Sequence, residues 1–341
     1  MARKNPKRKV KCSGKDIDSV KKTLEKMNYG IVGGHSAVQI CRWTKNVLRG
    51  DRGCWKEKFY GVNSAGCCQM TPSVMWCENQ CVHCWRPIEL NLGTDIGEVD
   101  DPIEILDGIV EGRKKLLMGF KGRKGIDKKM FEAALDPSLY TMSLSGEPTL
   151  YPRLGEMFKE IRRRGAVSFL VTNGLNPEVI AELKKSELPT QITLSMNAPN
   201  EKLFKQWHRS TKKNAWKKFN ETLDVLKSLG GKVRRVVRLT LVREGSGLLG
   251  ELTNMSDGNV AEYGDLIRKA EPDFVHVKGY MSVGYARKRM GYDKQPWFRD
   301  VKAFAEKLAD ELDDYKIAAE DERSCVVMLA RDGVKLKIDK V

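Results

Sequence analysis

The sequence predicts an α/β fold in the form of an open, partial (β/α)6 barrel. Short apolar runs rich in β-branched residues alternate along the chain with longer segments whose apolar residues recur at helical spacing. Helices between successive strands imply parallel pairing with right-handed crossovers. Six such strand–helix units are present, fewer than the eight of a closed barrel.

The predicted elements follow one another in this order. Residues 1–14 are rich in Lys and Arg and are expected to form a solvated, flexible tail, and residues 15–27 have the apolar spacing of a helix that stops before Gly30. The barrel strands are predicted at Met70–Trp76, Tyr140–Ser145, Ser168–Thr172, Gln191–Met196, Val233–Val242 and Phe274–Val277. The helices between them are predicted at Ile103–Phe120, Leu154–Arg164, Pro177–Ser186, Ala215–Leu229 and Val260–Ala270.

The C-terminal part is less regular. A helix is predicted at Asp300–Leu312, followed by strands at Lys316–Ala319 and Cys325–Ala330, and the Gly-rich run Glu244–Asn259 is expected to be a long loop over the barrel mouth. The chain is therefore divided into a tail (1–14), an N-terminal extension that carries cysteines (15–69), a barrel (70–285) and a C-terminal extension (286–341).

Composition and charge restrict the class of protein. The 341 residues include 61 Lys and Arg against 45 Asp and Glu, a formal net charge of +16, which favours a polyanionic partner such as nucleic acid. No stretch approaches 18 uninterrupted apolar residues, and no apolar core follows the basic N-terminus, so we expect neither a membrane span nor a signal peptide. We expect a cytoplasmic protein whose nine cysteines are reduced, buried or bound to metal.

Three cysteines follow the first predicted strand in a C-x3-C-x2-C pattern: Cys77, Cys81 and Cys84. A tight loop brings three such thiolates to one side, where they can hold an iron–sulfur cluster and leave one iron free for a small chelating molecule. The alternatives are a structural zinc site and three incidental thiols. Structural zinc prefers a second Cys pair downstream, and no such pair follows here.

This pattern resembles that of the radical S-adenosylmethionine (SAM) superfamily, whose fold is a partial, TIM-like (β/α)6 barrel. The resemblance implies a 4Fe-4S cluster on Cys77, Cys81 and Cys84, with SAM chelating the unique iron. His83 stands where the superfamily usually has an aromatic residue, and its ring can lie against adenine. Further SAM contacts are expected from polar residues at the ends of the next three strands: Ser145, Gly146, Glu147, Asn173, Ser195 and Asn197. Each of these short motifs is also compatible with an ordinary turn.

A second trio, Cys41, Cys54 and Cys67, has an even spacing of thirteen residues. The functional interpretation is a second cluster with an open iron, and the alternative is chance spacing of incidental thiols. Cys68 competes with Cys67 for the third position, because spacing alone does not separate adjacent residues. No role is assigned to Cys68, Cys12 or Cys325.

The sequence motifs around these cysteines resemble those of the tRNA 4-demethylwyosine synthases, and the resemblance extends over residues 31–290. The shared segments are His35–Val38, Cys41–Trp43, Cys54–Lys56, Lys58–Gly61, Cys67–Pro72, Cys81–Arg86, Ser143–Pro152, Leu194–Pro199 and Val277–Met281. The resemblance implies a reaction in which N1-methylguanosine beside the anticodon of phenylalanine tRNA is joined to a two-carbon piece of pyruvate. It implies two 4Fe-4S clusters and SAM as cofactors, with pyruvate held at the second cluster.

Lys56, two residues after Cys54, is the candidate amine for a Schiff base with pyruvate, because a lysine beside a cationic or metal centre loses its proton more readily. The alternative is a solvated lysine. Basic clusters interleaved with Trp207, Trp216 and Tyr292 are expected to bind tRNA. The candidate tRNA contacts are Lys212, Lys213, Lys217, Arg234, Arg235, Arg287, Lys288 and Arg289.

The remaining expectations concern partners and competing functions. No flavodoxin-like domain is readable before the barrel, so we expect an external electron donor such as flavodoxin or ferredoxin, and we expect a monomer. Two other functions compete with tRNA modification. One is a radical SAM enzyme for a peptide or small molecule, and the other is a non-catalytic, zinc-stabilised RNA-binding module.

Overall fold

The computed structural model describes residues 16–245 and 252–339. The predicted basic tail with Cys12, and the central part of the loop predicted at Glu244–Asn259, lie outside the described residues. None of the helices in the described ranges is long and apolar enough to cross a lipid bilayer.

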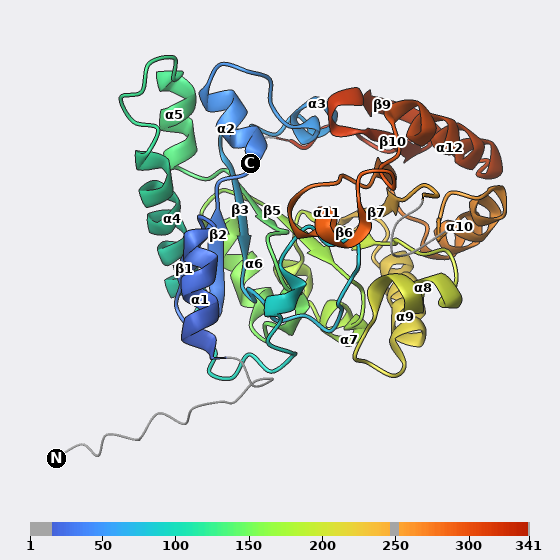
Figure 1. The fold of residues 1–341 in the computed structure, drawn as a ribbon, viewed down its shortest axis with the longest axis horizontal. Helices are drawn as coiled ribbons and strands as arrows, with labels where there is room; N and C mark the ends of the chain where they lie inside the picture. Colours follow the sequence, from blue (N-terminus) through green and yellow to red (C-terminus); the bar gives the residue numbers. More distant parts are fainter. Residues whose placement is uncertain (1–15, 246–251, 340–341) are drawn as a thin grey trace.

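A single ten-stranded sheet with the order β1-β2-β3-β4-β5-β6-β7-β8-β10-β9 organises the chain (Figure 1). Its six central strands are parallel, and they are β3 (Cys67–Thr71), β4 (Leu139–Met142), β5 (Val167–Thr172), β6 (Gln191–Ser195), β7 (Arg234–Leu241) and β8 (Phe274–Gly279). The sheet is not closed into a barrel. The predicted open barrel of six parallel strands is confirmed.

Helices connect the parallel strands and cover the outer face of the sheet, as crossover connections require. They are α4 (Pro102–Met118), α5 (Lys128–Leu135), α6 (Leu154–Arg163), α7 (Pro177–Ala181), α8 (Glu201–His208), α9 (Ala215–Ser228) and α10 (Asp257–Ala270). The helix predicted at Pro177–Ser186 ends at Ala181. The Glu187 carboxylate accepts the backbone N–H of Lys184 at 3.2 Å, which starts a separate 3-10 turn at Lys185–Glu187.

The first strand of the barrel differs from the prediction of Met70–Trp76, because β3 runs from Cys67 to Thr71. Pro72 has no N–H to donate to a ladder, and Met75 has a φ of 67°, so the chain leaves the sheet there. The Cys77 trio therefore sits at the end of a loop rather than at the end of the strand. This loop gives the cysteines room to fold over the carboxyl ends of the strands.

The N-terminal extension adds elements that were not predicted: β1 (Gly30–Val32), β2 (Ser36–Gln39), α2 (Arg42–Leu48) and α3 (Trp55–Tyr60), after the predicted helix α1 (Ile17–Lys26). Strands β1 and β2 extend the sheet as an antiparallel pair beside β3. The apolar residues of α3 pack against inward-facing residues near the amino ends of the barrel strands, among them Leu139, Phe169 and Phe274. This helix therefore fills the amino-terminal half of the barrel interior.

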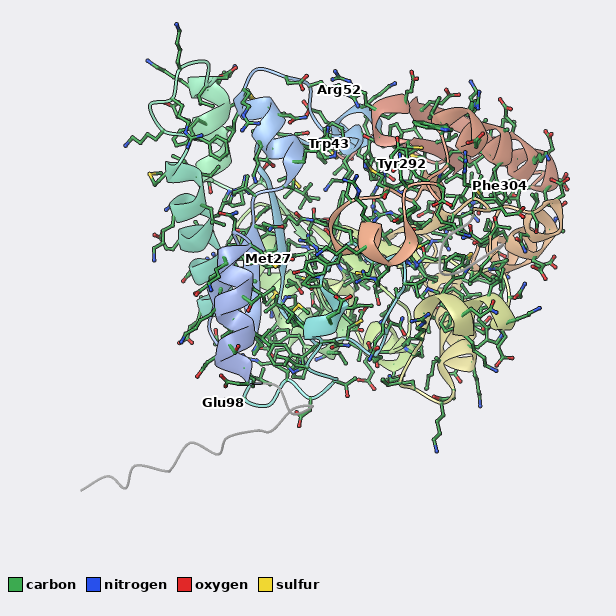
Figure 2. The ribbon with its side chains drawn as sticks, in the orientation of Figure 1. Met27, Trp43, Arg52, Glu98, Tyr292 and Phe304 are labelled. Atoms are coloured by element: carbon green, nitrogen blue, oxygen red, sulfur yellow. The ribbon has the colours of Figure 1, made fainter. Side chains whose placement is uncertain are left out.

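The C-terminal extension adds α11 (Gly284–Met290), α12 (Phe298–Glu311), β9 (Tyr315–Asp321) and β10 (Val326–Arg331). Strand β10 pairs antiparallel with β8, so the extension continues the sheet rather than forming a separate body. In Figure 1, α12 covers the end of the sheet opposite α4. Figure 2 shows side chains filling the molecule between these flanks, from Met27 on one side to Phe304 on the other.

Candidate active site

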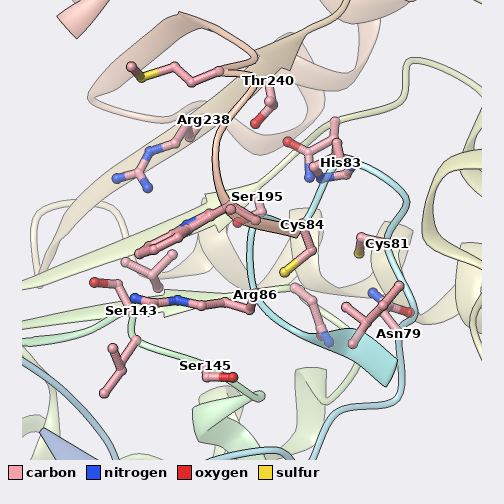
Figure 3. Close-up of a pocket in the computed structure, with 18 of the residues that line it drawn as sticks. Asn79, Cys81, His83, Cys84, Arg86, Ser143, Ser145, Ser195, Arg238 and Thr240 are labelled. Atoms are coloured by element: carbon pink, nitrogen blue, oxygen red, sulfur yellow. The ribbon is translucent and has the colours of Figure 1, made fainter. Parts of the chain in front are cut away.

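A cavity of about 670 Å³ lies at the carboxyl ends of the parallel strands (Figure 3). This is the position at which barrels place their reactive groups. Every residue predicted to bind the first cluster or SAM lines it, and these residues are Cys77, Cys81, His83, Cys84, Ser145, Gly146, Glu147, Asn173, Ser195 and Asn197. The structure thus brings together residues that lie as far apart in the sequence as positions 77 and 197.

The loop that carries the first trio is anchored at both of its sides. The backbone N–H of Cys77 donates to the carbonyl of Gly93 at 2.9 Å, and that of Val82 donates to the carbonyl of Trp207 at 2.9 Å. All three cysteines are half-buried, and none of them forms a disulfide. The backbone N–H of Asn79 donates to Cys77 Sγ at 3.4 Å. The trio is therefore a set of free, cavity-facing sulfurs on a fixed backbone.

The turn after β4 depends on a glycine at position 146. Gly146 has a φ of 74°, and a Cβ placed on it would lie 1.8 Å from the carbonyl oxygen of Ser73. The next backbone N–H, that of Glu147, donates to the carbonyl of Trp76 at 2.7 Å. Only glycine allows this turn to lie directly against the chain that leads into the cysteine loop.

Glu147 is the acidic group of this turn and is 2% exposed. Burial raises the pKa of its carboxyl to about 7, and the neighbouring carboxylate of Glu78 adds to the effect. Its oxygens accept hydrogen bonds from the hydroxyl of Thr172 and the backbone N–H of Asn173, both at 2.7 Å. A cationic group bound in the cavity would favour the ionised carboxylate.

Several buried polar atoms around the cavity have no hydrogen-bond partner among the described residues. They include both amide atoms of Asn79, Oδ1 of Asn197, Nε and Nη2 of Arg86 and Nε of Arg238. Unpaired buried polar atoms cost free energy, and native proteins rarely leave them unsatisfied. The cavity therefore fits a polar ligand with several donors and acceptors, as SAM has.

The second trio comes together inside the barrel. Cys41 and Cys54 are the N-cap residues of α2 and α3, and Cys67 begins β3. The three thiols are close enough to influence one another, because Cys67 and Cys41 both raise the pKa of Cys54, which burial raises most, to about 12. Even spacing along the sequence thus becomes proximity in space.

Cys67 and Cys68 lie on opposite faces of β3. Successive side chains of a strand point to opposite faces. Cys67 lies in the interior cluster with Cys54 and Trp55, whereas Cys68 lies in the larger core that contains Ile105 and Ile109 of α4. Cys67 therefore faces the side of β3 on which Cys54 lies, and Cys68 faces the opposite side.

Lys56 projects from α3 into the second trio. Its Nζ donates to Cys67 Sγ at 3.3 Å and to the hydroxyl of Thr141 at 3.2 Å. Burial lowers the pKa of the Lys56 amine, but the surrounding thiols, Cys67 first, outweigh it and raise that pKa above its usual value. The sulfur atoms of the second trio therefore surround this amine.

The first trio lines the cavity, whereas Cys41, Cys54, Cys67 and Lys56 are not among its lining residues. Arg42, Trp43 and Trp55, which directly follow Cys41 and Cys54 in the sequence, line the cavity together with the first trio. Arg86 lines the cavity, and its Nη1 donates to the hydroxyl of Tyr29 at 2.6 Å. Burial lowers the pKa of its guanidinium to about 10, while Tyr29 and the thiols of Cys84 and Cys41 raise it. A single side chain is thus within electrostatic reach of a sulfur from each trio.

Neither trio closes around a single metal ion. Within the part of the chain that the structure describes, the only three ligand atoms that all lie within 4.8 Å of one another belong to Cys81, His83 and His208. A tetrahedral zinc site holds its sulfurs about 2.3 Å from the ion, so all of them would lie closer together than that limit. Among the described residues, neither trio therefore has the close spacing of a zinc site.

Comparison with known proteins relates these features to a family. Residues 72–245 match the family model of the radical SAM superfamily, and residues 269–331 match the model for wyosine base formation. The S-adenosyl-L-methionine-dependent tRNA 4-demethylwyosine synthase of Pyrococcus abyssi is 41% identical over 319 residues, which cover 93% of this chain and 90% of that protein. The chain belongs to the tRNA 4-demethylwyosine synthase family.

Other members agree in sequence and structure. The synthase of Methanocaldococcus jannaschii is 32% identical, over 94% of this chain and 98% of its own. A solved structure of TYW1 with a lysine-pyruvate adduct bound is similar with a TM-score of 0.79 and 31% identity, over 94% of this chain and 97% of that chain. A crystal structure of archaeal TYW1 gives a TM-score of 0.72 and 29% identity, over 94% and 99%. The chain is therefore a radical SAM enzyme, and its family implies SAM and a 4Fe-4S cluster.

The basic residues expected to contact tRNA lie in different places in this synthase. Lys213 and Lys217 are exposed and, with Lys212, line a smaller pocket of about 320 Å³ beside Phe204 and Trp216. Lys212 is half-buried, and its Nζ donates to Asn176 Oδ1 at 2.5 Å.

On the other side of the cavity, Arg287 and Lys288 are exposed on α11. Gly284, which begins this helix, and His208, which ends α8, both line the cavity. Each of the two segments therefore follows a residue of the cavity wall.

Three of the expected tRNA contacts are corrected by the structure. Arg235 is 1% exposed and pairs with Asp273 at 2.7 Å, so its guanidinium does not reach the surface. Arg234 donates to the carbonyls of Lys335 and Leu336 at 2.8 and 2.9 Å. Both arginines begin β7 and so lie at the amino end of the strands, away from the cavity.

The third correction concerns Arg289. Its guanidinium donates to the carbonyls of Val82, Cys84 and Arg86 and pairs with Glu89 at 2.5 Å. These contacts tie α11 to the loop of the first trio. Arg289 therefore supports the loop of the first trio, and most of its guanidinium donors are used there.

Sequence reasoning missed four cavity residues in this synthase: Arg86, Arg238, Thr240 and Lys278. A signal for three of them was present. Arg238 and Thr240 alternate with apolar residues in a strand that is otherwise buried, and Lys278 stands near the end of an apolar run. A charged residue inside a barrel strand indicates a polar interior at that level.

Proposed function

We propose that this synthase condenses N1-methylguanosine, beside the anticodon of phenylalanine tRNA, with a two-carbon piece of pyruvate to form the tricyclic 4-demethylwyosine base. The observation that carries the proposal is the arrangement of the cavity, which has one cysteine trio on its wall and the second trio, with Lys56, directly behind the wall at Trp43 and Trp55. A reaction between two substrates needs both reaction partners at one site. The family to which the chain belongs supports this assignment.

In this proposal the first trio, Cys77, Cys81 and Cys84, holds the SAM-binding cluster, and the polar strand ends hold SAM. The Glu147 carboxylate accepts the ammonium group, the side chains of Ser145, Asn173, Ser195 and Asn197 and the backbone at Gly146 bond its other polar groups, and His83 lies against adenine. When bound, SAM and its cluster would supply a carbon radical that can take a hydrogen atom from the N-methyl group of the base. The chain's own residues orient SAM and keep it on the cavity wall.

The second trio, Cys41, Cys54 and Cys67, holds an auxiliary 4Fe-4S cluster in this proposal, and Lys56 binds pyruvate covalently. The amine nitrogen of Lys56 attacks the keto carbon, the C=N bond replaces the C=O bond, and the oxygen leaves as water. The methylene radical of the base then bonds to that carbon, which leaves the unpaired electron on the Lys56 nitrogen. Cleavage of the bond to the carboxylate carbon restores the C=N bond and releases a CO2 radical anion, which carries the unpaired electron away. The exocyclic nitrogen of the base then attacks the same carbon and displaces the Lys56 amine, which closes the ring. The lysine-pyruvate adduct recorded for a TYW1 structure supports the role of Lys56.

The proposed substrate requires a phosphate-binding rim around the cavity. Lys213 and Lys217 on one side and Arg287 and Lys288 on the other supply exposed cations there. The proposal further includes an external electron donor, such as flavodoxin or ferredoxin, and a monomeric enzyme. Cations at the rim attract the tRNA, while the aromatic residues of the cavity offer surfaces against which a base can stack.

We expect tRNA affinity to fall steeply as salt is added, because Lys213 and Lys217 displace counterions from phosphates. Replacing both by Gln is expected to lower the slope of log affinity against log salt by about 1 for each lysine. Lys316→Gln, which removes an exposed charge from the distant strand β9, serves as the matched control. An unchanged slope in the double variant would show that these lysines do not touch phosphate.

SAM binding is expected to depend on pH through Glu147, whose carboxyl has a pKa raised to about 7. Below that pH the carboxyl is neutral and offers no charge to the ammonium group, and above it the carboxylate is ionised. The ratio of SAM affinities between the wild type and Glu147→Gln is therefore expected to grow as pH rises through about 7. Equilibrium dialysis of SAM across this range gives the ratio, and a constant ratio would exclude the carboxylate as the ammonium acceptor.

The proposed reaction is tested by incubating the reduced, cluster-loaded enzyme with SAM, pyruvate and tRNA that contains N1-methylguanosine. Mass spectrometry of the nucleosides is expected to show 4-demethylwyosine only when all three are present. Formation of 5′-deoxyadenosine without a change in the tRNA would favour a peptide or small-molecule substrate. A colourless, zinc-containing protein that binds tRNA without any turnover would favour the RNA-binding module.

A further inference from the structure

Two neighbouring strands present three polar side chains to the interior of the cavity. In the parallel pairing of β7 with β8, Thr240 lies opposite Lys278, and Arg238 is two residues before Thr240 on the same strand. Residues two apart on a strand share a face. Arg238, Thr240 and Lys278 all line the cavity, so a guanidinium, a hydroxyl and an ammonium group stand side by side on its wall. Figure 3 shows Arg238 and Thr240 on that wall.

The two cations of this group lack a carboxylate partner. Among the described residues, the Arg238 side chain forms no hydrogen bond or ion pair, and its Nε is buried and unsatisfied. Lys278 Nζ donates to the carbonyl oxygen of Ser324, and the nearby carboxylate of Asp321 is paired with Arg52 at 2.7 Å. Two adjacent cations with no anion between them are costly unless a ligand supplies the negative charge.

The position of the group relates it to the second trio. The Trp55 ring packs against His276 of β8 with ring centres 4.8 Å apart, and His276 is two residues before Lys278 on that strand. The Arg238 guanidinium also lies 5.9 Å from the ring centre of Trp55, the residue between Cys54 and Lys56. An anion bound here would therefore lie on the β7 and β8 side of Trp55, the residue that precedes Lys56 on α3.

We propose that Arg238, Thr240 and Lys278 form the binding site for the carboxylate of the 2-oxo acid co-substrate. A planar guanidinium binds the two oxygens of a carboxylate in parallel, and the hydroxyl and ammonium groups complete the set of donors. The site is inside the barrel, whereas the exposed cations at the rim are the ones placed to meet phosphate. The identity of the acid as pyruvate rests on the proposed function, but the carboxylate site itself rests on these three residues.

The test compares pyruvate with pyruvamide, which replaces only the carboxylate by a neutral amide. Cluster-loaded enzyme is incubated with each compound and cyanoborohydride, and the reduced adduct on Lys56 is measured by peptide mass spectrometry. For Arg238→Gln and Lys278→Gln, the pyruvate concentration that gives half-maximal adduct is expected to rise about 10- to 100-fold, as for the loss of one charge-assisted hydrogen bond. The response to pyruvamide is expected to stay unchanged, and Lys232→Gln, an exposed lysine just before β7, is the charge-matched control.

Other outcomes separate this proposal from the proposed function. If no adduct forms on Lys56 in the wild type, the imine is wrong, and equilibrium dialysis of labelled pyruvate against wild type and Arg238→Gln still tests the carboxylate site. Unchanged pyruvate binding in both variants would overturn the site. If pyruvate binding is unchanged but SAM binding is weaker, the three residues bind the SAM carboxylate and the proposal is overturned. If pyruvate binding is unchanged but tRNA binding is weaker, they bind an RNA phosphate and the proposal is likewise overturned. Partial recovery of pyruvate binding in Arg238→Lys shows that a cation, not the fold, is what was lost.

Discussion

Replacing Lys56 by methionine is expected to abolish formation of 4-demethylwyosine. The substitution keeps most of the apolar stem of the side chain and removes the nitrogen that donates to Cys67 and Thr141 at 3.3 and 3.2 Å. A covalently tethered reaction partner corresponds to an effective concentration of at least about 10⁵ M, so we expect a fall in rate of roughly 10³-fold or more. The measurement is the initial rate of modified nucleoside formation at saturating pyruvate.

The same helix offers a matched control for this variant. Lys58 is exposed, and its Nζ donates to the carbonyl of Glu320 rather than to a cysteine. Lys58→Met therefore removes an amine of the same type from the same helix without touching the second trio, and its rate is expected to match the wild type. Turnover by Lys56→Met at the wild-type rate would exclude a covalent role for this lysine.

Alanine at Cys54 is expected to remove about half of the bound iron, and alanine at Cys84 is expected to remove the other half. Two 4Fe-4S clusters hold about eight irons per chain, and loss of one of three cysteine ligands leaves too few thiolates to hold a cluster. Cys54→Ala is expected to keep SAM binding, because the residues expected to hold SAM line the cavity and Cys54 does not. Cys84→Ala is expected to lose SAM binding as well as the visible absorption of its cluster.

Cys68→Ala is the control for these two variants. Cys68 is adjacent to Cys67 but faces the core beneath α4. Among the charged groups that act on the pKa of its thiol, Arg113 has a larger effect than any residue of the second trio. Its iron content per folded chain is expected to equal that of the wild type. Iron and absorption spectra that are unchanged in Cys54→Ala, or halved in Cys68→Ala, would show that the second trio is not the ligand set.

Much of the fold was predictable from the sequence because the parallel strands carry a strong local signal. The run Ser168–Thr172 was predicted as a strand, and the observed β5 begins one residue earlier. The first strand was placed wrongly because the apolar run continues past Pro72, and only tertiary contacts show that the chain leaves the sheet there. The short elements β1, β2, α2 and α3 were not predicted, because helices of six or seven residues and strands of three or four have little periodicity to detect.

The candidate site divides in the same way. Residues within a motif, such as Cys77, Cys81 and Cys84, were predictable because their spacing in a single loop already implies a shared ligand. Arg86 was missed, since nothing in its sequence neighbourhood shows that its side chain lines the cavity. Arg235 was assigned to the surface because charge in a sequence favours exposure, yet its partner Asp273 compensates the charge in a buried place.

The most direct test of the central claim is an anomalous scattering map, recorded at the iron edge, from crystals of the anaerobically reconstituted enzyme. The account predicts two four-iron peaks at one cavity, one bounded by Cys77, Cys81 and Cys84 and the other by Cys41, Cys54 and Cys67. A single peak, a zinc signal in place of iron, or a second peak outside the reach of Lys56 would contradict it.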